Sequence, residues 1–307
     1  MSAQTTQDST DRHGHRFDAG RRWEASLDLG FRHDGQATRL YRVDHRGPLR
    51  VQRPFYPEGR DGTCHVYLLH PPGGLVSGDI LDIQARVGAG ARALLTTPAA
   101  NKLYRADRNA VAWSQRTRLV VEEGGLLEWL PQETIAFDGS RGVQATEIEL
   151  SGSARCLGWE VLALGRPASD LPFASGHLEQ RFRLSRDGRP LWIERQPLDP
   201  DHRRFHGAWG QRGCSVQATL WAVGLEDESA AIERLRQGLG QGGNDLAGSP
   251  GAGEAERWAV TVRDGVLLLR YLGHSRREAW SLCEAAWTLL RPMLMDREAC
   301  VPRIWFT

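Results

Sequence analysis

Four carboxylates occupy positions where an acid is unusual. Glu160 lies inside the apolar run 158–165, where a charged side chain is costly unless it is paired or hydrated. Asp79 ends a turn rich in glycine, and Glu133 and Asp138 bracket a short apolar segment. Two interpretations remain open. These acids form structural ion pairs with arginines, or they line a hydrated passage whose oxygen ligands hold a cation weakly.

Soft metal ligands are grouped at only one place. Cys64, His65 and His70 lie on or beside an expected strand, and imidazole and thiolate suit nickel. Neighbours on a strand point to opposite faces, so Cys64 and His65 cannot chelate one ion. A buried cysteine and histidine is the commoner outcome, although a transient nickel path through these residues stays open. No metal or other cofactor is expected to bind tightly.

A glycine-rich turn supports a second, enzymatic hypothesis. Gly88–Ala93 matches G-x-G-x-x-A after an expected strand, which is compatible with an NAD(P)-binding oxidoreductase. That motif needs a helix beginning inside the glycines. The β-branched pair Thr96 and Thr97, followed by Pro98, disfavours such a helix. A tight turn between strands is the preferred interpretation.

Most of the chain that must position these residues is predicted to be strand. Short alternating apolar runs recur every 10–15 residues from about residue 23 to 225, and 34 glycines fall largely between them. Asp187-Gly188 and Asp264-Gly265 predict hairpins. The fold class is therefore mainly β. A β-helix with paired acids such as Glu133 and Asp138 is also compatible with a carbohydrate-active enzyme.

Two segments break the strand pattern. Residues 227–239 and 275–295 have apolar side chains at helical spacing, and Pro292 is expected to bend or end the second helix. The second helix carries Trp280 and Trp287 on its apolar stripe. These rings either pack on the sheet or serve a partner, because tryptophan is enriched in interface hot spots.

Composition limits the classes of partner. The 307 residues are 40% hydrophobic with a formal net charge of +1, so nothing in the charge favours nucleic acid, and no apolar run is long enough to span a membrane. Five scattered cysteines fit reduced thiols in the cytoplasm. Residues 1–20 are expected to be a disordered tail, and residues 240–256 a flexible loop within a single domain, 21–307.

Six ordered motifs resemble the UreD (UreH) family of urease accessory proteins. They are spread along most of the chain, and Ser77 stands where the family usually has glycine. They are Arg53–Gly59, His70–Asp79, Leu94–Pro98 with Lys102–Arg105, Glu128–Glu133 with Phe137–Asp138, Leu164–Arg166, and Pro302–Thr307.

The resemblance implies a β-helix-like body with two helices and a role that is not enzymatic. It implies a scaffold that binds the urease apoprotein and UreF, which recruits the GTPase UreG, and that conducts nickel in transit. Asp79, Glu133, Asp138 and Glu160 are then candidates for the path of the ion. Trp280, Trp287, Arg303 and Trp305 are candidates for the partner interface.

Overall fold

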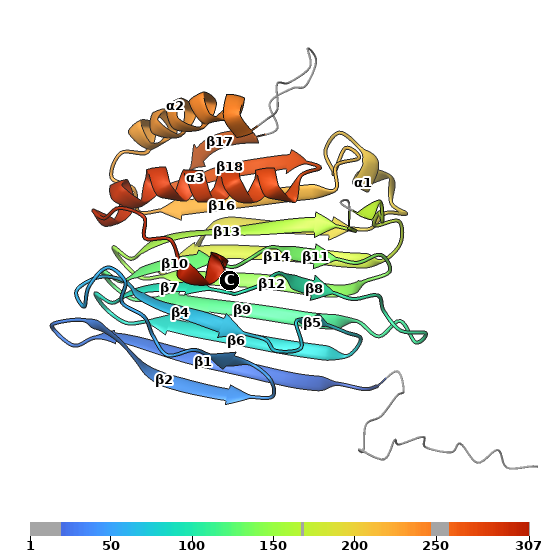
Figure 1. Cartoon of the computed structure of the whole chain (residues 1–307), viewed down its shortest axis with the longest axis horizontal. Coiled ribbons are helices and arrows are strands. Elements are labelled where there is room, and N and C mark those ends of the chain that lie inside the picture. Colours follow the sequence, from blue (N-terminus) through green and yellow to red (C-terminus); the bar gives the residue numbers. More distant parts are fainter. Residues whose placement is uncertain (1–19, 167–168, 247–257, 307) are drawn as a thin grey trace, which may run out of the picture.

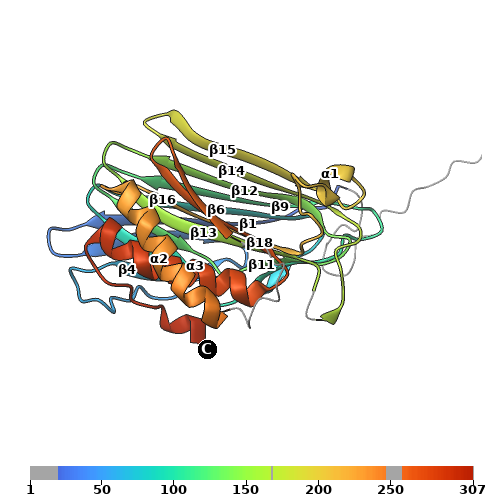
Figure 2. The same ribbon diagram turned by 90° about the horizontal axis from the view of Figure 1, so that it is seen from above.

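The computed structural model describes residues 20–166, 169–246 and 258–306. Strands dominate these residues, and the predicted mainly-β fold is confirmed. The strands form two sheets that lie face to face, and two long helices cover the outer face of one of them (Figures 1 and 2). The fold is therefore a sandwich of three layers, sheet, sheet and helices.

The first sheet has seven strands, and its outer face carries no helix (Figure 2). The inner strands pair in parallel, and hairpins close both edges. In spatial order the strands are β15 (Arg189–Leu198), β14 (His177–Arg186), β12 (Arg141–Leu150), β9 (Trp113–Val121), β6 (Asp79–Val87), β1 (Trp23–His33) and β2 (Thr38–Arg46).

The second sheet has eleven strands. Its main path is β17 (Trp258–Arg263), β18 (Val266–Gly273), β16 (Val216–Val223), β13 (Arg155–Leu164), β10 (Leu126–Leu130), β7 (Arg92–Thr96), β4 (Cys64–Leu69) and β3 (Arg50–Val51). Three short strands lie beside this path: β11 (Thr134–Ala136), β8 (Asn101–Leu103) and β5 (Gly74–Leu75).

Between β6 and β14 the chain alternates between the two sheets. Each turn places one strand in each sheet, parallel to the previous one, which is the geometry of a β-helix. The hairpins predicted at Asp187-Gly188 and Asp264-Gly265 join β14 to β15 and β17 to β18. All four of these residues have positive φ, as a two-residue hairpin turn of this type requires.

The helices pack on the outer face of the second sheet. They are α2 (Glu228–Leu246) and α3 (Arg276–Met295), and Ser275 caps α3 by accepting a hydrogen bond from the Glu278 N–H. Pro292 lies inside α3, which ends one turn later. One apolar core fills the space between the sheets, and a second lies between the second sheet and the helices.

Three expectations need comment. Residues 240–246, predicted as part of a flexible loop, continue α2 instead, because the helix runs through Gly240 to Leu246. The four-residue α1 (Arg203–His206) was not predicted, since it is too short to show periodicity. The expected tail lies outside the described residues, apart from Gly20, and so does most of the expected loop.

Candidate functional site

Three neighbouring strands of the second sheet are interrupted side by side. β4 stops before His70–Gly73 and β5 follows, β7 stops before Thr97–Ala100 and β8 follows, and β10 stops before Pro131–Glu133 and β11 follows. The strands before the breaks pair in the same order as those after them. Proline and glycine explain each break, since proline cannot donate to a ladder. We call the aligned interruptions the slot.

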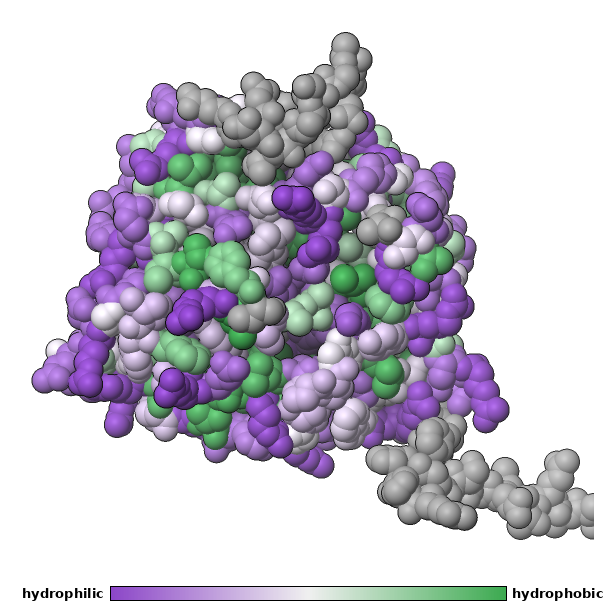
Figure 3. All heavy atoms as spheres, in the orientation of Figure 1, coloured by the Kyte–Doolittle hydropathy of each residue, from purple (hydrophilic) through white to green (hydrophobic). Residues whose placement is uncertain are grey.

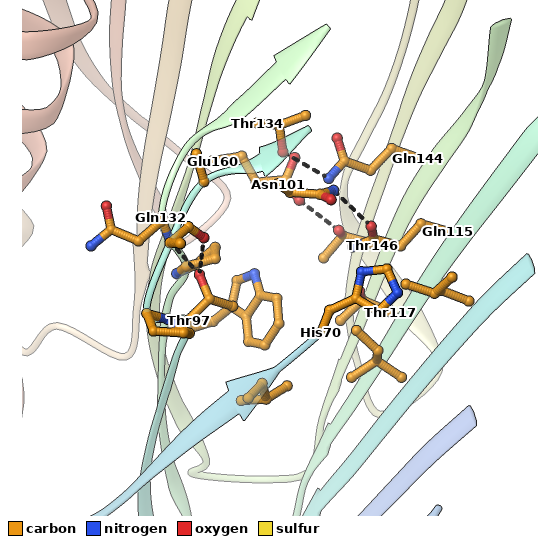
Figure 4. A pocket seen from close by; sticks show the side chains of 18 of the residues that line it. His70, Thr97, Asn101, Gln115, Thr117, Gln132, Thr134, Gln144, Thr146 and Glu160 are labelled. Atoms are coloured by element: carbon orange, nitrogen blue, oxygen red, sulfur yellow. Dashed lines mark hydrogen bonds between the residues drawn. The ribbon is translucent and has the colours of Figure 1, made fainter. Parts of the chain in front are cut away.

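A cavity of about 110 Å³ lies between the sheets behind the slot. All three breaks contribute to its lining, as do residues of the first sheet (Figure 4). The face that carries the C-terminal turn η2 (Arg303–Phe306) is hollowed near its centre, below the layer of α3 (Figures 1 and 3). We call the cavity of about 110 Å³ behind the slot the chamber. Its volume accommodates a few water molecules or a hydrated ion.

The first sheet lines the chamber and the space beyond it with amides. Gln115, Gln144, Gln180 and Gln196 are register partners on four adjacent strands. We call this row the glutamine ladder. Nε2 of Gln180 donates to Oε1 of Gln144 at 3.2 Å. Amide side chains on one face of neighbouring strands can hydrogen-bond to one another, so a polar row persists inside an otherwise apolar sandwich.

The second sheet faces this ladder with its own polar side chains. Asn101 donates from Nδ2 to Oε1 of Gln115 at 3.0 Å, and Gln144 donates to the Thr134 hydroxyl at 3.4 Å. Gln217 donates to both Gln180 and Gln196, each at 2.7 Å. The amides thus bridge the sheets from the chamber to the strand β16.

One of the four candidate acids lines the chamber. Glu160 extends from β13 and accepts a hydrogen bond of 2.5 Å from the Thr146 hydroxyl (Figure 4). Burial raises the pKa of Glu160 to about 7, and the Thr146 hydrogen bond offsets part of that increase. Glu160 also lines a void of about 30 Å³ with Gln180 and Gln217. It therefore stands where the chamber meets the interior beyond.

His70 is the imidazole at the slot. Its ring lies on the side of the chamber facing Thr117 (Figure 4). Its Nε2 is buried and has no hydrogen-bond partner among the described residues. Burial lowers the pKa of His70 from its ordinary value, which favours the neutral form that can bind a metal ion. Of the three candidate soft ligands, His70 alone reaches the chamber.

Asp79 and Asp138 hold turns and do not line the chamber, so a part for them in an ion path stays a prediction. Asp79 accepts the Val76 N–H at 2.8 Å, and burial raises its pKa. Asp138 accepts from the N–H groups of Ala174 and Ser175 and pairs with Arg105. Burial alone would raise the pKa of Asp138, but the Ser175 contacts and Arg105 hold it below its usual value.

Glu133 is also structural in its contacts. It is buried at the end of the slot, and its Oε1 accepts from Arg276 of α3 at 2.8 Å. It does not line the chamber. Because Glu133 and Asp138 are engaged by different elements, they form no facing pair, and the geometry gives no support to the carbohydrate-active alternative.

Cys64 and His65 do not approach His70 as ligands. Cys64 points into the core between the sheets, and His65 faces the opposite side. Nε2 of His65 lies 3.1 Å from Glu58, which pairs with Arg291, and Arg291 in turn pairs with Glu128. The described residues contain no group of three or more histidine, cysteine or acidic side chains suited to a metal ion.

The tryptophans predicted as an interface belong largely to the helix-side core. Trp287 is fully buried, and its Nε1 donates to Glu128 at 2.6 Å. Trp280 and Trp305 are half-buried and contact the Trp159 ring. Arg303 is exposed on η2. The interface interpretation is therefore corrected for Trp287, and the exposed part of this region is the C-terminal turn.

The Gly88–Ala93 segment is a turn. The Ala91 N–H bonds to the Gly88 carbonyl at 3.0 Å, and the chain continues directly into β7. A pyrophosphate site would need a helix N-terminus here. The structure therefore contradicts the dinucleotide alternative.

Sequence reasoning missed the glutamine ladder. Gln115 lies between Ser114 and Arg116, and Gln180 lies between Glu179 and Arg181, so these glutamines look like ordinary polar positions in their strands. The four glutamines lie on the face of the first sheet that points to the second sheet. This shared orientation can be recognised only when the register of the four strands is known.

The fold and the site define a β-helical sandwich protein with an internal chamber between its two sheets. The described part of the chain includes no helix with the length and apolarity needed to cross a membrane. Residues 24–306 match the family model described as UreD urease accessory protein.

Similar proteins carry the same description. A protein named urease accessory protein UreD from Marinobacter nauticus is 64% identical over 99% of this chain and 100% of its own length. One from Pseudoalteromonas translucida is 59% identical, covering 96% of this chain and 94% of its own. One named UreD 2 from Brucella anthropi is 43% identical, covering 93% and 98%. The chain belongs to the UreD family of urease accessory proteins, whose role is in urease maturation.

Proposed function

We propose that this chain is a non-enzymatic scaffold of urease maturation that passes nickel through the chamber. The chain would assemble in the cytoplasm with the urease apoprotein, UreF and UreG. Nickel would be cargo in transit, not a resident cofactor. The observation that carries the proposal is the slot, behind which lies a chamber whose largely apolar lining includes amides, hydroxyls, the His70 imidazole and one carboxylate.

The chemistry of the lining supports transit in preference to storage. A divalent ion entering a sandwich must exchange its hydration for protein oxygen or retained water. Amide and hydroxyl oxygens of Gln144, Thr146 and Asn101 offer such contacts, and Glu160 adds one titratable carboxylate. His70 offers a single imidazole. One imidazole and one carboxylate among neutral groups suit a weak site, from which the ion can leave.

Glu160→Gln tests the proposal. The substitution keeps size and an oxygen that accepts the Thr146 hydrogen bond, but it removes the charge from the chamber. We expect co-purification with UreF and the urease apoprotein to be unchanged and the nickel content per urease site to fall several-fold, measured by atomic absorption. Full nickel content would contradict the passage.

Glu133→Gln is the matched control. Glu133 is another buried acid of the second sheet's side of the slot, but it pairs with Arg276 and does not line the chamber. Its variant should lower thermal stability and leave the nickel content of each assembled complex unchanged. Equal nickel loss in both variants would mean that any buried acid matters only for the fold.

A further inference from the structure

We propose that the loop 199–213, which includes α1, is a docking surface for an acidic partner protein. The loop lies at one end of the sandwich in both ribbon views (Figures 1 and 2). It belongs to none of the family motifs that the sequence analysis singled out, and it contributes nothing to the chamber lining. The proposal rests on the proposed function only in taking the partner from the maturation assembly.

The loop carries the most exposed large apolar side chain of the described residues, ahead of Phe306 of η2 at 77%. Trp209 has a relative exposure of 103%, against 62% for Ile193, another strongly exposed apolar side chain on the first sheet. An indole in water gains a large contact area when a partner covers it, and tryptophan and arginine are the residues most enriched in binding hot spots.

The loop groups several arginines that have no acidic partner in the described structure, whereas some arginines of the first sheet are paired. On the first sheet, Arg116 pairs with Glu147 and Arg86 pairs with Glu122. In the described structure, no carboxylate lies within ion-pair distance of Arg203, Arg204 or Arg212 of the loop, and all three are exposed.

The acids of the loop do not cancel this charge. Asp199 lies 3.6 Å from Nδ1 of His177, and Asp201 is the remaining exposed carboxylate. The loop thus carries three arginines without an ion-pair partner in the described structure against two acids, Asp199 and Asp201, a formal net charge of +1. A partner surface that complements the arginines carries carboxylates around an apolar pocket.

The loop is held in shape from beneath. Gln211 is buried, its N–H donates to the Phe205 carbonyl at 2.7 Å, and its Nε2 donates to Gln217 at 2.6 Å. The Phe205 ring packs against the core between the sheets. A preorganised loop loses little conformational entropy on binding, which favours a docking role over that of a free tether.

The loop borders a cleft that leads toward the amide row. A cleft of about 480 Å³ is lined by Arg204 and Trp209 from the loop and by Gln196 and Gln217 from the strands. Gln196 and Gln217 also line the small void that Glu160 shares with the chamber. A partner seated on Trp209 therefore covers the surface nearest to the inner end of the amide row.

Trp209→Ala and the double variant Arg203→Glu, Arg204→Glu test the proposal in the full chain, co-expressed with the urease apoprotein, UreF and UreG. We expect Trp209→Ala to weaken the binding of one protein component about 30-fold. The charge reversal should weaken the same component about 10-fold at low salt and reduce its salt dependence. Ile193→Ala and Arg189→Glu are matched controls on the first sheet, and their binding should be unchanged.

Unchanged binding of every protein component in both loop variants would overturn the proposal. So would loss of binding to single-stranded RNA in these variants while protein binding persists, since arginine and tryptophan also suit nucleic acid. Failure of the passage is distinguishable. Raising the concentration of the weakened component should restore nickel loading in Trp209→Ala, whereas it should not restore loading in Glu160→Gln.

Discussion

The two faces of the second sheet bury different kinds of polar side chain. On the helix side, Glu58, His65, Glu128 and Arg291 form a charged cluster without a cavity, with Arg291 and Glu128 completely buried. On the inner side, three glutamines of the ladder, other neutral polar side chains and the carboxylate of Glu160 line the chamber together with apolar residues. In this molecule, buried charge marks a structural joint, and buried neutral polarity marks the candidate passage.

The difference follows from what each arrangement costs. Ion pairs removed from water are stable only when their partners are in place, so the charged cluster resists rearrangement. Amides lose less on burial and can exchange hydrogen bonds with water or a passing ion. A conduit built of ion pairs would either bind a cation tightly or collapse on itself.

Trp287→Ala should produce the largest loss of stability. The ring is fully buried against Trp159 and Trp305, and its N–H donates to Glu128 of the charged cluster. Removing it creates a cavity and leaves a buried carboxylate short of a donor. We expect the free energy of unfolding to fall by about 5 kcal/mol, measured by urea denaturation. Full stability would show that this ring is not part of the core.

Arg291→Met should cost about 3–5 kcal/mol, because it leaves Glu128 and Glu58 buried without their cation. The matched control is Arg297→Met, whose partner Asp61 is exposed. That surface pair should contribute at most about 1 kcal/mol. Similar losses in the two variants, measured by thermal denaturation, would remove the distinction between a structural joint and an ordinary surface pair.

The charged cluster around Arg291 could not be predicted from the sequence, whereas most of the secondary structure could. The strands, both hairpins and both long helices follow from local alternation, Asp-Gly pairs and helical spacing, all readable within a dozen residues. The charged cluster joins residues 58, 65, 128 and 291, and no local pattern connects them. The slot is an intermediate case. Each break is visible as a proline or glycine turn, but their alignment depends on the register of β4, β7 and β10.

The candidate acids make the same point at the level of single side chains. The expectation was that Glu160, in its apolar run, is either paired with an arginine or hydrated; its hydrogen bond comes from the Thr146 hydroxyl, and its hydration stays a prediction. The sequence could not assign the outcomes for the other acids, because Glu133 meets Arg276 from α3 and Asp138 meets Ser175, far along the chain. Glu160 of the second sheet lines the chamber and accepts from Thr146 of the first sheet, a contact that depends on how the two sheets face each other.

The Glu160 carboxyl in the chamber should make the free energy of unfolding depend on pH. Because burial raises its pKa from 4.5 to about 7, the native chain holds a proton between these values that the unfolded chain has released. The free energy of unfolding should therefore fall as the pH rises through this window, by about 1–3 kcal/mol. Glu160→Gln should remove this contribution, measured as the difference between urea denaturation at pH 5 and pH 8. An unchanged difference would show that the carboxyl is solvated in the native state.

Gln144→Leu should have the smallest effect on stability and a distinct effect on function. Leucine nearly preserves the volume, and the loss of the hydrogen bonds with Gln180 and Thr134 should cost about 1 kcal/mol. If the amides replace part of the ion's hydration, an apolar side chain at this rung raises the barrier to passage, and nickel loading of urease should slow several-fold with the assembly intact.

Gln84→Leu, on the exposed face of β6, is the control, and it should change neither stability nor nickel loading. If loading slows in Gln144→Leu but not in the control, the substitution acts on the passage of the ion. Normal loading would instead mean that the ladder serves only to join strands, and neutral polarity would then carry no more functional meaning than the charged cluster on the other face.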